Sequence, residues 1–127
     1  WYTFPDKTIP WPYGFGGTPF TEADFPAYLA ANMVVQLGNA DNDPAHDSLR
    51  RTPEAMHQGA HRLERGQAFF EAGKQAAAAR HIDFNWRLQI VDGVEHDNKA
   101  MAPFAAQLMA DFIETLPSPA DQPAHQE

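Results

Sequence analysis

The sequence predicts an α/β fold with two or three strands, a long connecting helix and a C-terminal helix. Two apolar segments of strand length, residues 33–37 and 84–91, are separated by a helix-forming segment at residues 52–80. A second apolar helical pattern follows at residues 101–113. Because strands that alternate with helices usually pair side by side in a mainly parallel sheet, we expect that arrangement here.

The chain divides by composition into three parts. Residues 1–24 mix aromatic side chains with prolines and glycines, which excludes long helices from this segment. Residues 25–116 carry the strand and helix patterns and form the predicted α/β portion. Residues 117–127 are proline-rich and polar, and we expect them to form a flexible tail.

The first expected elements are a short helix and a buried strand. Residues 25–31 favour the helix, with Thr21 or Asp24 as its N-cap. Residues 33–37 are short and apolar, and Gly38 follows them directly. A short apolar run that ends at a glycine is typical of a buried strand.

A strong helix start follows a polar, Asp-rich loop over residues 39–52. Thr52 has the side chain of an N-cap, and Pro53 stands at the first helical position. Apolar spacing and a run of alanines predict one continuous helix to about Arg80. Three glycines lie on nearly one face of this helix, where it can pack closely against a sheet or another helix. These glycines are Gly59, Gly66 and Gly73.

The second expected strand alternates between apolar and polar side chains, which predicts one exposed face, as at a sheet edge. The apolar set is Phe84, Trp86, Leu88 and Ile90, and the polar set is Asn85, Arg87 and Gln89. Residues 101–113 then form an amphipathic helix, which the prolines at 117 and 119 prevent from continuing.

Charge and composition exclude several classes of function. The formal net charge is −8, and the lysines and arginines are spread singly, which argues against nucleic acid or an anionic membrane as a main partner. No apolar stretch approaches the roughly 20 residues that a membrane span needs. The chain has no cysteine, which excludes disulfides, thiol nucleophiles and thiolate zinc sites without fixing the cellular compartment.

Two polar residues follow the two expected strands. Asp41 lies just beyond the glycine that ends the first strand, and His96 lies in the loop after the second. Since loops at the carboxyl ends of parallel strands can converge on one point, we expect the two side chains to meet. A carboxylate that orients an imidazole makes a general base for a hydroxyl nucleophile. We therefore assign His96 as base and acid and Asp41 as its carboxylate, with Asp43 as the alternative acid if the loop register differs.

The nucleophile of such a triad is missing from the sequence. Ser48 and Ser118 are the only serines, and neither lies in a Gly-x-Ser-x-Gly turn between a strand and a helix. Ser48 is in a polar loop and Ser118 is between two prolines. We expect the isolated chain to lack serine-hydrolase turnover.

The segments around the acid and the histidine resemble the C-terminal part of the α/β-hydrolase superfamily, over about residues 32–113. Leu37-Gly38-Asn39-Ala40-Asp41 is similar to its segment in which a glycine ends a strand and the triad acid follows three positions later. Gly93-Val94-Glu95-His96-Asp97 resembles its Gly-x-x-His loop. Thr52-Pro53-Glu54-Ala55 and Arg65-Gly66 are similar to a bacterial subfamily with a long connection between acid and histidine.

This resemblance implies a partial α/β-hydrolase-like fold and the chemistry of a serine esterase. The implied substrate is a small ester or acyl compound, and no cofactor is implied. A pair of short strands leaves unpaired edges and uncovered apolar faces, so we expect either an N-terminal portion that completes the sheet or self-association. The competing function is that of a non-catalytic α/β binding or assembly module.

Other residue groups have less support as sites. Asp41, Asp43, His46 and Asp47 resemble a calcium loop but lack the EF-hand glycine and terminal glutamate. His57 and His61 have the spacing of a zinc pair without a third ligand. We therefore expect no metal site.

The aromatic opening has two interpretations. Trp11, Tyr13 and Phe15 could contact a substrate, because apolar rings on loops are common in ligand pockets. The favoured interpretation is a segment that covers the sheet.

Overall fold

The computed structural model describes residues 1–118, and residues 119–127 of the predicted tail lie outside the described part. The chain forms two compact units, Trp1–His96 and a second that begins at Asp97. The elements in chain order are η1 (Glu22–Asp24), α1 (Phe25–Ala30), β1 (Val34–Gly38), α2 (Pro53–Gln58), α3 (Arg62–Arg80), β2 (Arg87–Val91) and α4 (Asn98–Glu114).

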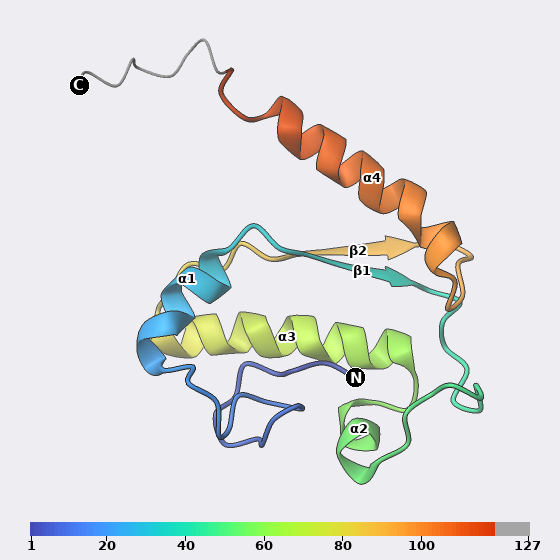
Figure 1. Ribbon diagram of the computed structural model, residues 1–127, viewed down its shortest axis with the longest axis horizontal. Helices are drawn as coiled ribbons and strands as arrows, with labels where there is room; N and C mark the ends of the chain where they lie inside the picture. The colour runs from blue at the N-terminus through green and yellow to red at the C-terminus, as the bar shows by residue number, and fades with distance from the viewer. Residues whose placement is uncertain (119–127) are drawn as a thin grey trace. The chain divides into compact units, whose positions relative to one another are not determined.

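A parallel pair of strands is the centre of the first unit. β1 and β2 pair from Val34 opposite Arg87 to Gly38 opposite Val91. Between them the chain crosses over through α3, which lies along one face of the pair (Figure 1). The predicted α/β fold is therefore confirmed, with two strands in the described residues.

α3 packs closely on the sheet because two of its residues have no side chain. A Cβ atom at Gly66 would overlap the Leu37 side chain, and one at Gly73 would overlap the Trp86 ring. The close packing predicted for these two glycines is confirmed. The buried core that results combines α1, α3 and the strands: Phe25, Leu29, Val35, Leu37, Phe69, Ala77 and Trp86.

The predicted single helix from Pro53 to Arg80 is wrong, because the chain forms two helices there. α2 ends at Gly59, whose φ of 154° lies outside the range that other residues adopt without strain. α3 then starts afresh with His61 as its N-cap, whose Nδ1 accepts a hydrogen bond from the backbone N–H of Glu64 at 3.2 Å. Thr52 and Pro53 start α2 as predicted.

The aromatic N-terminal segment, residues 1–24, covers α3. The interpretation favoured from the sequence was that it covers the sheet. The Tyr2 ring stacks on Phe69 of α3 with ring centroids 4.8 Å apart, and Phe4 contacts the same ring. In Figure 1 this segment lies on the side of α3 that faces away from the strands. α3 lies between this segment and the strands (Figure 1).

The two faces of the strand pair differ in their side chains. Gln36 and Gln89 are hydrogen-bonded to each other at 2.6 Å, so they share one face. On the other face Val35 and Leu37 are buried, while Leu88 and Ile90 of β2 remain 36% and 42% exposed. α3 thus covers β1 more fully than β2.

The second unit contains the expected C-terminal helix. α4 begins at Asn98, earlier than predicted, because the Asp97 side chain accepts hydrogen bonds from the backbone N–H groups of Lys99 and Ala100. None of its residues is buried. Across residues 1–118, no helix combines the length and the apolar character needed to cross a membrane.

Candidate functional site

The loops that follow β1 and β2 are joined by one asparagine. The Asn39 side-chain amide donates to Asp92 Oδ1 at 2.7 Å, and its carbonyl oxygen accepts from the backbone N–H of Gly93 at 2.8 Å. Gly93 has a φ of 73°, a left-handed conformation that costs glycine little. Asn39 therefore holds the β2 loop in a fixed position beside the β1 loop.

Gly38 allows these loops to approach each other closely. The carbonyl oxygen of Val94 accepts from the backbone N–H of Ala40 at 3.0 Å, and it lies where a Cβ atom on Gly38 would be. Because the obstructing atom belongs to the backbone, it cannot move aside as a side chain could. A glycine is therefore required at position 38, because any larger residue would collide with the Val94 backbone.

Asp41 and His96 meet at the end of these loops. His96 Nδ1 lies 3.0 Å from Asp41 Oδ2, which is hydrogen-bonding distance. The Asp41 side chain is 16% exposed and that of His96 is 51% exposed, so the carboxylate lies beneath the imidazole. The backbone carbonyl of Asp41 also accepts from the N–H of Leu63, which ties the acid to the start of α3.

The negative charge of Asp41 reaches a neighbouring aromatic residue. Burial raises the pKa of Tyr2, and the nearby Asp41 carboxylate raises it further. The N-terminal segment therefore runs close to the acid.

Three further side chains surround the pair, and the sequence reasoning assigned a role to none of them. Arg62 Nη1 forms an ion pair with Asp41 Oδ1 at 3.4 Å, and its Nη2 donates to Ser48 Oγ at 2.9 Å. Ser48 in turn contacts the ring of His46, which lies edge-on to the His96 ring at a centroid distance of 5.8 Å. Arg62 is the first residue of α3, so only recognition of the helix break at Gly59 and of the His61 cap would have pointed to it.

Asp43, the alternative acid, is engaged elsewhere in the same loop. Its Oδ1 accepts from the backbone N–H of Ala45 at 2.8 Å, a local turn that aspartates often form. Arg51 closes the loop by donating to the carbonyl oxygens of Pro44 and His46. The geometry thus brings Asp41, and not Asp43, to within 3.0 Å of His96.

The three aromatic residues considered as substrate contacts have different surroundings. Tyr13 is buried, and its hydroxyl contacts Thr52 Oγ1 at 2.7 Å and accepts from Arg50 Nε at 2.8 Å. Phe15 stacks on Phe20 with ring centroids 4.1 Å apart. Trp11 is 62% exposed. A substrate contact by any of the three stays a prediction.

The histidine pair considered for zinc is separated by the helix break. His57 belongs to α2, whereas His61 caps α3 through its own Nδ1. Within residues 1–118, no group of three or more histidine and carboxylate side chains is arranged to hold a metal ion.

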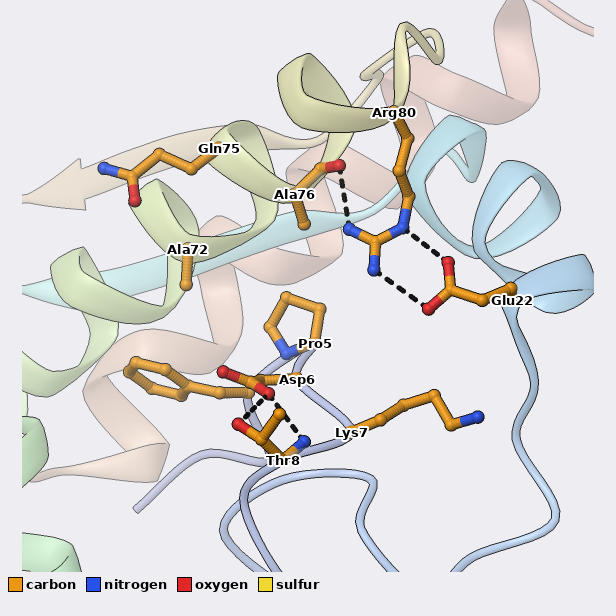
Figure 2. Close-up of a pocket in the computed structure, with 10 residues that line it drawn as sticks. Pro5, Asp6, Lys7, Thr8, Glu22, Ala72, Gln75, Ala76 and Arg80 are labelled. Carbon is orange, nitrogen blue, oxygen red and sulfur yellow. Dashed lines mark hydrogen bonds and ion pairs between the residues drawn. The ribbon is translucent and has the colours of Figure 1, made fainter.

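A pocket of about 370 Å³ lies beside the C-terminal half of α3. Figure 2 shows that Asp6, Glu22 and Arg80, three of the charged residues that line the pocket, are already hydrogen-bonded within the protein. Arg80 forms two hydrogen bonds to Glu22 and one to the Ala76 carbonyl, and Asp6 accepts from Thr8. The pocket therefore offers a ligand fewer polar partners than its lining residues suggest.

Two solved structures of hydrolases resemble this chain. The poly(aspartic acid) hydrolase-1 from Sphingomonas sp. KT-1 is 41% identical, with a TM-score of 0.83, over 85% of this chain and 41% of that chain. The poly(3-hydroxybutyrate) depolymerase from Bordetella parapertussis is 37% identical, with a TM-score of 0.81, over 95% of this chain and 40% of that chain.

The chain therefore spans about two fifths of the length of these two proteins. No family model matches the sequence, and no curated protein matches it either. The parallel strand pair, its crossover helix and the structural similarity to these hydrolases together show that the chain has a partial fold of the α/β-hydrolase type.

Proposed function

We propose that this chain is the acid-and-histidine portion of a hydrolase that cleaves ester or related acyl bonds. The observation that carries the proposal is the 3.0 Å contact between His96 Nδ1 and Asp41 Oδ2. The two residues follow parallel strands, at the sheet edge where α/β proteins place their ligands.

The proposed reaction uses the two nitrogens of His96 for different purposes. Nδ1–H donates to the Asp41 carboxylate, which fixes the tautomer and leaves Nε2 free to accept a proton. Nε2 takes the proton of a hydroxyl nucleophile as that oxygen attacks the substrate carbonyl, and then gives it to the leaving group. Asp41 stabilises the imidazolium that forms between these two steps.

The nucleophile is proposed to come from outside these 127 residues. Ser48 Oγ accepts from Arg62 and contacts His46, so the serine beside the pair already has hydrogen-bond partners. The two similar hydrolases are more than twice as long as this chain, which leaves room for a nucleophile-bearing portion in proteins of this fold.

The proposed substrates contain an acyl bond. One similar structure is named for poly(aspartic acid), a polyamide, and the other for poly(3-hydroxybutyrate), a polyester. Both linkages present a carbonyl carbon to a nucleophile. We propose small esters of the same chemistry as the simplest substrates.

An additional β-structured segment is proposed to complete the sheet. The partial exposure of Leu88 and Ile90 and the presence of only two strands in the described residues support this proposal. The segment would be an N-terminal portion or, failing that, a second copy of this chain. Sedimentation of the protein over a hundredfold concentration range would identify self-association, and a constant monomer mass would contradict that form of the proposal.

The test is hydrolysis of p-nitrophenyl acetate by the protein as it is naturally produced. His96→Ala should lower kcat/KM by roughly 10⁶-fold, because the base is lost. His57→Ala is the matched control, since His57 is an exposed histidine on α2, and it should leave kcat/KM unchanged. Equal turnover in the two variants would contradict the proposed function.

A further inference from the structure

We propose that Arg62 is a positioning residue that holds the Asp41 carboxylate against His96, and that Ser48 and His46 hold Arg62 in turn. This inference rests on the proposed function, because it concerns the preparation of His96 as a base. Arg62 itself need not touch the substrate.

The two oxygens of Asp41 have different partners. Oδ2 lies 3.0 Å from His96 Nδ1, and Oδ1 lies 3.4 Å from Arg62 Nη1. A carboxylate held at both oxygens cannot rotate about its χ2 bond without losing one contact. The Asp41 and Arg62 side chains are only 16% and 17% exposed, so water screens this ion pair less than it screens a surface pair.

Arg62 is itself fixed from the other side. Its Nη2 donates to Ser48 Oγ at 2.9 Å. The Ser48 backbone N–H donates to His46 Nδ1 at 3.2 Å, so this nitrogen is an acceptor. It can therefore also accept a hydrogen bond from the Ser48 hydroxyl, which lies 3.1 Å away.

Together the contacts form a closed ring of five side chains that includes the proposed base. The His46 ring meets the His96 ring at 79°, an edge-to-face arrangement. The planar guanidinium provides two donors in fixed directions, one for Asp41 and one for Ser48, which a lysine ammonium does not reproduce. The ring comprises Asp41, His96, His46, Ser48 and Arg62.

The test observes the His96 Nδ1 proton directly, by proton NMR of the protein labelled with ¹⁵N-histidine. A proton that is hydrogen-bonded to a carboxylate exchanges slowly with water and gives a low-field signal. Arg62→Gln should raise its exchange rate about tenfold. The variant loses the hydrogen bond to Asp41 Oδ1, so the carboxylate moves away from the Nδ1 proton more often. Arg62→Lys keeps the charge without the planar fork and should raise the rate by a smaller factor.

Arg80→Gln is the matched control. Arg80 lies on the same helix and makes two contacts to Glu22, at 2.9 and 3.2 Å, beside the pocket shown in Figure 2. This variant removes an ion pair of the same type far along α3 and should leave the Nδ1 proton unchanged. An unchanged exchange rate in folded Arg62→Gln would overturn the inference.

A second variant decides the matter if Arg62→Gln does not fold. Ser48→Ala removes one acceptor of Arg62 without touching Asp41, and it should raise the exchange rate about threefold. No change in that variant would then overturn the inference.

The readout also separates this inference from the proposed function. A slow Nδ1 proton that depends on Arg62, in a protein without esterase turnover, would contradict the hydrolase proposal and leave the role of Arg62 standing. In an active protein, Arg62→Gln should lower kcat with KM unchanged, because the substrate is not its partner.

Discussion

At the scale of single residues, the candidate site depends on a glycine that has no side chain as much as on the side chains that form the site. Gly38 has no Cβ, so the Val94 carbonyl can reach the β1 loop. Asn39 then joins the two loops through both ends of its amide. The distance between Asp41 and His96 follows from these contacts, since both side chains extend from the joined loops.

Gly38→Ala tests this dependence. The added methyl group would overlap the Val94 carbonyl oxygen and should cost about 1–3 kcal/mol in the free energy of unfolding. It should also separate Asp41 from His96 and so abolish His96-dependent turnover. Thermal unfolding and p-nitrophenyl acetate hydrolysis measure the two effects.

Gly17→Ala is the comparison for that variant. Gly17 has a φ of 78° and open space around its Cβ position, so alanine there introduces backbone strain without a clash. It should lower stability and leave turnover intact. A Gly38→Ala protein that keeps full turnover would contradict the role given to Gly38.

Tyr28 gives a residue-scale prediction about pH. Burial raises the pKa of Tyr28 to about 12 from the usual 10.0. Since the unfolded chain ionises this phenol first, the unfolded state gains stability as the pH rises from about 10 to about 12. The free energy of unfolding should fall there by up to about 1.4 kcal/mol per pH unit from this group.

The measurement compares urea unfolding of the wild type and Tyr28→Phe at pH 9 and pH 11. The Tyr28 ring packs on Trp86 with centroids 5.1 Å apart, and phenylalanine can keep that contact. The variant should lose less stability between the two pH values than the wild type does. Identical losses would show that Tyr28 is not responsible. Tyr2, whose pKa burial also raises, keeps its contribution in both proteins.

At the scale of elements, the start of α3 links the fold to the candidate site. His61 caps the helix, and the next two residues each contact Asp41: Arg62 through its side chain and Leu63 through its backbone N–H. The N-terminus of α3 thus positions the acid. A change in the cap should therefore alter both helix stability and the site.

His61→Ala tests the cap. The loss of the acceptor for the Glu64 N–H should lower the free energy of unfolding by about 1 kcal/mol. Asparagine is a good N-cap residue, so His61→Asn should restore most of that loss. Chemical denaturation measures both. Equal stability of the alanine variant and the wild type would contradict the capping role.

The sequence predicted the elements by different signals, with different success. The short apolar run before Gly38 predicted β1, and the alternation of apolar and polar residues before Asp92 predicted β2. The continuous helix failed because apolar spacing persists through Gly59, where the backbone turns. A histidine followed three residues later by a glutamate was the available signal for a new helix start.

The sequence predicted the contact between Asp41 and His96 but not the side chains around it. Asp41 and His96 stand at fixed offsets from strand ends, so the sequence could place them at one edge of the sheet. Arg62 reaches the pair from the start of α3, and His46 reaches it from the 39–52 loop. Such contacts depend on the path of the 39–52 loop, which no periodic pattern in the sequence specifies.

At the scale of the whole molecule, the 127-residue chain is similar to about two fifths of each of two hydrolases, and its Asp41 and His96 side chains are in contact. The two strands in the described residues, 1–118, are few for a sheet of this type, because sheets usually contain four to six. The proposed hydrolase therefore needs further strands and a nucleophile beside this portion. Its activity depends on how that assembly presents the nucleophile to His96.

The central claim is that Asp41 and His96 act as one unit, and a double-mutant cycle on kcat/KM tests it most directly. Residues that act together lose activity non-additively. Asp41→Asn should lower kcat/KM for p-nitrophenyl acetate by roughly 10⁴-fold when His96 is present, and by less than about threefold in the His96→Ala background. Equal and independent losses in the two backgrounds, or no loss in either, would contradict the account.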